Sequence, residues 1–176
     1  MNARNLLPIL TLATALAGCS TVGDLPTERI ASAQLALGNG IPAGTVQLLG
    51  HGNKLSLAIA VTGIPEGAHG FHLHTTGKCT APDFKSAGGH LNPSGAEHGT
   101  LNSKGHHLGD LPNLEVGGSK TATTTIDLEG DRTQILAAMF DDDGTAVVIH
   151  EGADDYMSDP AGAAGPRIAC GVFKRL

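Results

Sequence analysis

Residues 54–62 read KLSLAIAVT. Their four large apolar side chains recur at every second position, so all four share one face of an extended chain. The next five residues, 63–67, read GIPEG, and two glycines with a proline are typical of a turn. This segment therefore predicts a β-strand with one buried face that ends in a tight turn.

Short runs of the same kind occur on both sides of this strand, separated by glycine-rich turns. We expect strands over 31–37, 44–49, 54–62, 69–75, 110–116, 120–128, 145–150 and 167–173. Eight short strands predict an all-β fold, an eight-stranded antiparallel Greek-key β-barrel or sandwich. Residues 76–106 lack periodicity and predict a long functional loop, whereas 135–140 fit either a helical turn or a loop.

Composition narrows the class of protein. A length of 176 residues fits one domain, and no repeat or second domain is evident in the sequence. The chain has 11 Lys+Arg against 17 Asp+Glu, a net charge of −6, which argues against a nucleic-acid partner. Aromatic residues make up only 3% of the chain, too few for a surface that stacks nucleic-acid bases.

The first eighteen residues indicate export rather than fold. Arg4 is the only charged residue before position 19, and an apolar run covers 6–17. A positive start followed by a short apolar core is typical of an export signal. The run is also too short to span a bilayer as a helix.

The end of this signal resembles that of bacterial lipoproteins, because Leu-Ala-Gly directly precedes Cys19. The resemblance implies a lipid on Cys19 that anchors the chain on the periplasmic side of the envelope. Ser20 follows, which implies delivery to the outer membrane; an ordinary secretory signal is the alternative. We expect a lipoprotein signal peptide at 1–18, the lipidated cysteine and a tether at 19–30, and one folded domain at 31–176.

Two cysteines remain after Cys19, namely Cys79 and Cys170. An exported pair is expected to form a disulfide, since that compartment is oxidising. The bond would close a loop of about 90 residues and stabilise the fold by roughly 4–5 kcal/mol in the chain-entropy model. Two free buried thiols are the alternative.

Nine histidines in so short a chain are unusual, and their spacing suggests a metal centre. His72 and His74 lie two apart on an expected strand, so both point to one face and can bind one ion. Imidazole suits copper and zinc, and three histidines with one carboxylate suit tetrahedral zinc. The candidate ligands are His72, His74, His90, His98, His107, Asp110 and His150.

Six motifs in one order connect these ligands to a known family. They are GFHLH at 70–74, GHLNP at 89–93, HG at 98–99, HLGDLPN at 107–113, VIHE at 148–151 and GPRIACGV at 165–172. In this order they closely resemble copper–zinc superoxide dismutase, and the resemblance covers residues 31–174. The folded domain at 31–176 is thus expected to be a superoxide dismutase domain with long metal-binding and electrostatic loops.

The resemblance implies a role for each matched residue. His90 would bridge the two metals and act in catalysis, and Arg167 would attract and orient superoxide. Asp154 would link copper and zinc ligands, and Cys79 with Cys170 would be the family's disulfide. The implied copper ligands are His72, His74, His90 and His150, and the implied zinc ligands are His90, His98, His107 and Asp110.

The implied function is the disproportionation of superoxide to dioxygen and hydrogen peroxide by a cycling copper ion beside a structural zinc. It would protect the cell envelope; the family includes monomers and dimers, so a homodimer is one expected form. The alternative is a non-catalytic copper- and zinc-binding envelope protein. Since the segment between His150 and Arg167 has no lysine, we expect Lys85 or Lys104 to assist capture of the anion.

Overall fold

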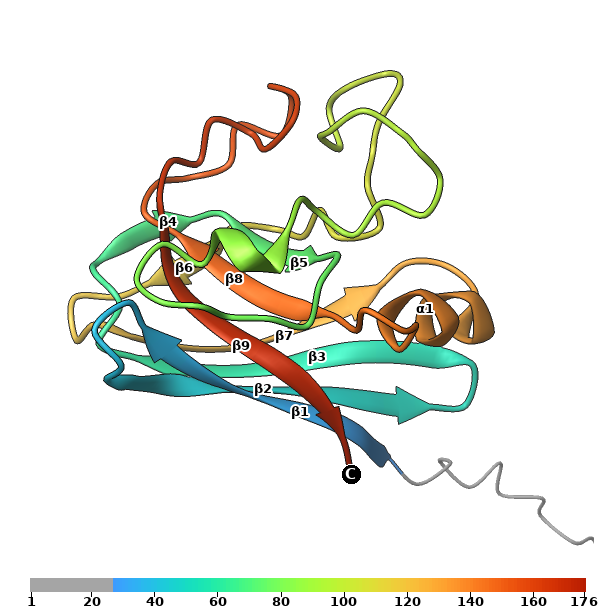
Figure 1. The fold of residues 1–176 in the computed structure, drawn as a ribbon, viewed down its shortest axis with the longest axis horizontal. Helices are drawn as coiled ribbons and strands as arrows, with labels where there is room; N and C mark the ends of the chain where they lie inside the picture. The colour runs from blue at the N-terminus through green and yellow to red at the C-terminus, as the bar shows by residue number, and fades with distance from the viewer. Residues whose placement is uncertain (1–26) are drawn as a thin grey trace, which may run out of the picture.

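The computed structural model describes residues 27–176, so the signal peptide, Cys19 and most of the tether lie outside the described residues. The described chain forms nine strands, one short 3₁₀ helix and one α-helix (Figure 1). Their bounds are β1 Glu28–Leu37, β2 Pro42–His51, β3 Lys54–Thr62, β4 Gly67–His69, β5 Phe71–His74, η1 Lys85–Ala87, β6 Leu114–Val116, β7 Thr121–Leu128, α1 Arg132–Met139, β8 Ala146–His150 and β9 Arg167–Arg175.

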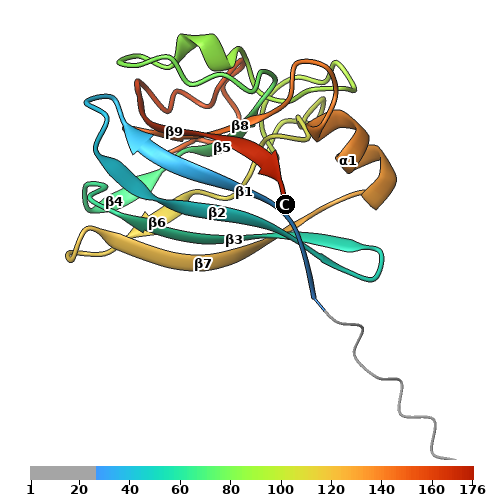
Figure 2. The same ribbon diagram turned by 60° about the horizontal axis from the view of Figure 1, so that its bottom comes forward.

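Within residues 27–176, seven strands form one antiparallel sheet in the order β5-β8-β9-β1-β2-β3-β7, and β4 pairs with β6. Figure 2 shows the sheet curling, so that β9, β8 and β5 lie over β1, β2, β3 and β7. Alternate residues of each strand fill the space between, among them Leu57 and Ile59, both at most 1% exposed. The expected all-β antiparallel class is confirmed, as a curled half-barrel.

The expected strand at 69–75 was wrong in one respect, because it is two strands, β4 and β5, separated at Gly70. The amide of Gly70 donates to Gly152 O (2.8 Å), and its carbonyl accepts from the His150 amide (2.8 Å). These two hydrogen bonds hold Gly70 against the end of β8 and the residues that follow it. Residues 27–176 therefore form nine strands rather than the eight expected.

The expected strand at 110–116 shortens to β6, and residues 110–113 lie outside it. Pro112 has no amide hydrogen to donate to a neighbouring strand. The side chain of Asp110 turns instead toward the histidines.

Several further strand boundaries differ from expectation by one to three residues. β1 begins at Glu28, which pairs with Gly50, so the last three residues assigned to the tether are strand. The segment at 135–140, which fitted a helical turn or a loop, lies mostly in α1. Asp131 caps this helix by accepting the Gln134 amide at 3.0 Å.

Two long connections, 75–113 and 151–166, lie on the same side of the curled sheet; in Figure 1 the part with η1 lies near the middle and the rest reaches the top. A disulfide joins Cys79 in the first connection to Cys170 in β9, as expected. Phe84 and Ala87 pack beside it in a small apolar cluster separate from the main core. Within the described part of the chain, no helix is long and apolar enough to cross a membrane.

Candidate metal centre

Four buried imidazoles meet beside the end of β5. His72 and His74 project from β5, and His150 ends the adjacent β8, which pairs with β5 in antiparallel register. His90 reaches the same point from the 75–113 connection, where its backbone forms an isolated β-bridge with His74. One ligand atom from each of the four lies within 4.8 Å of the others.

The hydrogen bonds of these rings show which nitrogens face the shared point. His74 Nδ1 donates to Gly88 O (3.0 Å) and His150 Nδ1 donates to Gly165 O (2.9 Å). His72 is turned the other way, since its Nε2 donates to Asp154 Oδ2 (2.7 Å).

The opposite nitrogen of each ring is buried and, within residues 27–176, has no hydrogen-bond partner; these atoms are His72 Nδ1, His74 Nε2, His90 Nε2 and His150 Nε2. Burying one such atom without a partner is costly. Four together fit a metal that prefers imidazole ligands, such as copper.

A second set of three imidazole rings converges on one carboxylate oxygen. Asp110 Oδ1 lies 2.8 Å from His90 Nδ1, 3.0 Å from His98 Nδ1 and 3.0 Å from His107 Nδ1. An ion with bonds of about 2.0 Å in tetrahedral geometry has ligand–ligand edges of about 3.3 Å. The His98 contact also lacks hydrogen-bond geometry. Three imidazoles and a carboxylate at these separations fit zinc.

Two residues join the sets. His90 offers Nδ1 to the second set and Nε2 to the first. Asp154 accepts from His72 Nε2 through Oδ2 (2.7 Å) and from His98 Nε2 through Oδ1 (3.0 Å). The structure therefore places Asp154 between the two sets, where the resemblance expected it.

Burial and hydrogen bonds together set the protonation of these groups. It lowers the pKa of both His90 and His150 to about 4, and nearby imidazoles add to the effect for each. Burial alone raises the pKa of Asp110, but hydrogen bonds from His90 and from the Gly99 and His107 amides outweigh it and leave the pKa well below its ordinary value. Neutral imidazoles and ionised carboxylates are the forms that bind metals.

The sequence model of the family described as copper/zinc superoxide dismutase (SODC) matches residues 42–173. The chain belongs to this family. Its enzyme class is superoxide dismutase, with copper and zinc as cofactors. Both metal sites of the family are intact, copper at His72, His74, His90 and His150, and zinc at His90, His98, His107 and Asp110.

Relatives cover most of the domain. The Cu-Zn superoxide dismutase 2 of Aquifex aeolicus is 40% identical over 156 residues, which cover 82% of this chain and 86% of the relative. The extracellular Cu-Zn superoxide dismutase of Caenorhabditis elegans is 36% identical over 157 residues, 86% of this chain and 63% of the relative. The crystal structure of a double mutant of a superoxide dismutase-like protein from Bacillus subtilis has a TM-score of 0.74 and 38% identity, and covers 80% of this chain and 95% of that chain.

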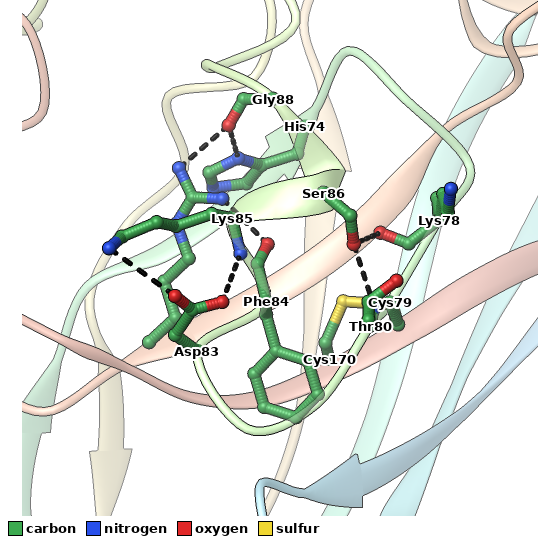
Figure 3. The surroundings of a disulfide bond; sticks show 11 residues. His74, Lys78, Cys79, Thr80, Asp83, Phe84, Lys85, Ser86, Gly88 and Cys170 are labelled. Atoms are coloured by element: carbon green, nitrogen blue, oxygen red, sulfur yellow. Dashed lines mark hydrogen bonds and ion pairs between the residues drawn. A yellow bond between two sulfur atoms is a disulfide. The ribbon is translucent and has the colours of Figure 1, made fainter.

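In this superoxide dismutase, Arg167 begins β9 beside the copper site. Its Nη1 donates to Phe84 O (2.8 Å) and its Nη2 to Gly88 O (2.6 Å). Figure 3 shows that the same Gly88 oxygen accepts from His74, so one carbonyl ties the guanidinium to a copper ligand. The Cys79–Cys170 disulfide lies to the right of Phe84 in the figure and joins the connection that carries Phe84 and Gly88 to β9.

An open hollow of about 560 Å³ lies in front of Arg167, lined also by Pro82, Asp83, Lys85, Gly165 and Pro166. Lys85 pairs with Asp83 at 3.3 Å on its rim. Lys104 pairs with Glu97 at 3.1 Å in the part of the 75–113 connection that carries the zinc ligands, here called the zinc loop. Of the two lysines expected to assist capture, Lys85 is the one that lines this hollow.

Sequence reasoning assigned no role to Asn113 or Tyr156. The Asn113 side chain donates to the Asp154 carbonyl and accepts from the Asp154 amide. The Tyr156 amide donates to Asp154 Oδ1 (2.7 Å). Asn113 stands inside the motif at 107–113, which is a usable signal. Tyr156 lies outside the motifs, and only the folded loop reveals its contacts.

Proposed function

We propose that this chain disproportionates superoxide to dioxygen and hydrogen peroxide in the cell envelope. Four imidazole nitrogens without a hydrogen-bond partner in residues 27–176 carry this proposal, together with Arg167, which shares the Gly88 oxygen with His74. When bound, copper supplies one-electron oxidation and reduction, and zinc supplies a fixed positive charge on the far side of His90.

Arg167 binds and orients the substrate anion. Two carbonyl oxygens fix its guanidinium, so little side-chain entropy is lost when an anion binds. Burial lowers the pKa of Arg167, with Asp83 opposing this effect, yet an arginine stays charged in a protein. A fixed positive group at the hollow favours a small anion over neutral molecules.

His90 holds and delivers a proton. Its Nε2 is buried without a partner within the described chain, whereas Nδ1 stays against Asp110. When Nε2 is free of the metal, it would take up a proton from solvent and pass it to the departing peroxide, and solvent would supply the second proton of hydrogen peroxide. Asp154 fixes the orientation of two neighbouring rings, because its carboxylate accepts hydrogen bonds from both His72 and His98.

Lys85 adds to the positive field at the hollow, although the chain as a whole is net negative. A cleft can focus a local potential against the overall charge. The acidic residues of the 151–166 connection interfere less than the sequence suggests. Asp154 faces imidazoles, and Asp159 accepts the His98 amide (2.7 Å).

Export of the chain is supported by the disulfide and by the similarity to an extracellular relative. We propose further that Cys19 is lipidated and anchors the enzyme to the outer membrane, on its periplasmic side. Metabolic labelling with a fatty acid tests this, with Cys19→Ser as the control. Equal labelling of the wild type and of Cys19→Ser would contradict the proposal that Cys19 is lipidated.

Stopped-flow decay of superoxide tests the activity, with the protein loaded with copper and zinc. We expect a rate constant approaching about 10⁸–10⁹ M⁻¹s⁻¹. Arg167→Gln should lower it severalfold, and Lys120→Gln, an exposed site on a distant turn, should leave it unchanged. A rate no faster than that of the metal-free protein would favour the non-catalytic metal-binding alternative.

A further inference from the structure

Tyr156 is the single tyrosine of a chain without tryptophan. It lies two residues after Asp154 and bonds to three separate segments. Its amide donates to Asp154 Oδ1 (2.7 Å), its carbonyl accepts from the Leu101 amide (3.0 Å), and its hydroxyl accepts from the Asn113 amide (2.7 Å). All three segments adjoin the zinc site.

The hydroxyl contact continues toward the metal ligands. The Asn113 side chain donates to Asp154 O (2.9 Å) and accepts from the Asp154 amide (2.8 Å). The Asp154 carboxylate then accepts from His98 Nε2 (3.0 Å). A continuous line of hydrogen bonds thus runs from the phenol through Asn113 and Asp154 to a zinc ligand.

The backbone around Tyr156 is tightly constrained as well. Tyr156 has a φ of 61°, in the left-handed region that residues with a β-carbon rarely adopt. A β-carbon at Gly99, directly after His98, would overlap the Tyr156 carbonyl oxygen. The two loops therefore touch backbone to backbone, and such a strained residue persists only where its surroundings hold it.

We propose that Tyr156 is a positioning residue for zinc, and that its hydroxyl holds Asn113 and thereby the carboxylate that orients His98. The effect falls mainly on zinc, because His98 lies in a loop and depends on side-chain contacts. His72, the other partner of Asp154, is fixed within β5 by its pairing with β8.

The variant Tyr156→Phe removes only the hydroxyl. Ser158→Ala is the matched control, because it removes a hydroxyl of the same loop that bonds Asp155 on the surface. In copper-free full-length protein, chelator competition should show about tenfold weaker zinc binding in Tyr156→Phe, at the lower end of the range for groups behind metal ligands. Ser158→Ala should bind zinc as the wild type does.

A purely structural role makes a different prediction. It would lower the melting temperature of metal-free and zinc-loaded protein equally and leave zinc affinity unchanged, and that result overturns the proposal. Cobalt(II) in the zinc site gives a second readout. Its visible spectrum should change in Tyr156→Phe, and a spectrum identical to that of the wild type would count against the proposal.

Tyrosine emission supplies an independent measurement, because the whole protein's emission comes from Tyr156. Zinc titrated into the copper-free protein should change this emission in step with binding. Unchanged emission at saturation contradicts the coupling. None of these measurements uses superoxide, so their outcome is separate from that of the proposed catalytic activity.

Discussion

The copper and zinc halves of the centre are built differently. Three copper ligands stand on paired strands, His72 and His74 in β5 and His150 at the end of β8. The zinc ligands His98, His107 and Asp110 all lie in the long connection, outside the named strands.

This difference shows where each half obtains its order. The strands that present the copper ligands are fixed by the core, since the neighbouring Leu73, Val147 and Ile149 are each 0% exposed. The zinc half is ordered by polar side chains that converge on Asp110 and Asp154. Folding of the sheet therefore positions most of the copper half, whereas the zinc half depends on side-chain contacts within and between the long connections.

Removal of one ligand from each half should produce the largest effect. His150→Ala takes away a copper ligand, so the dismutation rate should fall on the order of 1,000-fold, equivalent to about 4 kcal/mol. Zinc content should hold, because the four zinc ligands remain. Asp110→Ala should lose zinc and keep copper. Metal analysis beside stopped-flow kinetics checks both variants, and loss of both metals from His150→Ala would show that the halves are not separable.

The disulfide ties the connection that holds Arg167 to β9. Without it, this part of the copper half should be held by loop contacts alone, as the zinc ligands are. Cys79 and Cys170 are 91 residues apart, so replacing both with serine should lower the free energy of unfolding by about 4 kcal/mol. The segment with Phe84 O and Gly88 O should then loosen around Arg167, and the rate should fall as well. Urea unfolding of the metal-free protein measures the first effect. A loss below about 1 kcal/mol would show that packing at Phe84 already holds the loop.

Acid should distinguish the two halves in the metal-free protein. The pKa values of His90 and His150 are about 4 in the folded state and about 6.5 when unfolded. The unfolded chain therefore binds more protons between these values, and the free energy of unfolding should fall by roughly 3–4 kcal/mol from pH 7 to pH 5 for the two groups together.

The zinc-side carboxylate should respond later, since the folded pKa of Asp110 lies below its ordinary value. Its contribution is present above about pH 3.9 and is lost only as the pH falls further. Urea unfolding at each pH gives the profile. His51→Gln, at the exposed end of β2, is the control and should follow the wild-type curve. A flat profile from pH 7 to pH 5 would rule out the buried neutral histidines.

The smallest effect concerns the approach of the anion to the copper half. Lys85→Gln should lower the association rate about two- to threefold at low ionic strength, and Asp83→Asn should raise it by a similar factor. Lys104→Gln, paired on the zinc loop, should do neither. Rates measured against salt concentration test this. If Lys85→Gln and Lys104→Gln changed the rate and its salt dependence equally, a lysine at the hollow would have no special role in capture.

The sequence predicts most where local pattern decides the structure. The alternation at 54–62 predicts β3 with its observed bounds, and the His-x-His spacing of His72 and His74 places both on one face. The break at Gly70 depends on bonds to residues about 80 positions away, which no local pattern contains. The start of α1 was readable, since Asp131 with Gln134 three residues later is a helix-capping signal.

The support around the ligands was the least predictable part. Ligand identity follows from residue type and spacing, but orientation follows from contacts between two connections distant in sequence. The bond between Tyr156 and Asn113 spans 43 positions. Such contacts form only after the sheet brings both connections to one side.

The direction of β9 has a practical consequence. The strand runs from Arg167 at the hollow to Arg175, which pairs with Ala31 near the start of β1. Eight steps of about 3.3 Å separate the two ends by roughly 26 Å, and Figure 1 shows the C-terminus beside the start of β1, away from the long connections. A support or fusion partner joined ahead of Thr27 would thus leave the hollow that Arg167 lines facing outward, which suits oriented immobilisation on a sensor surface.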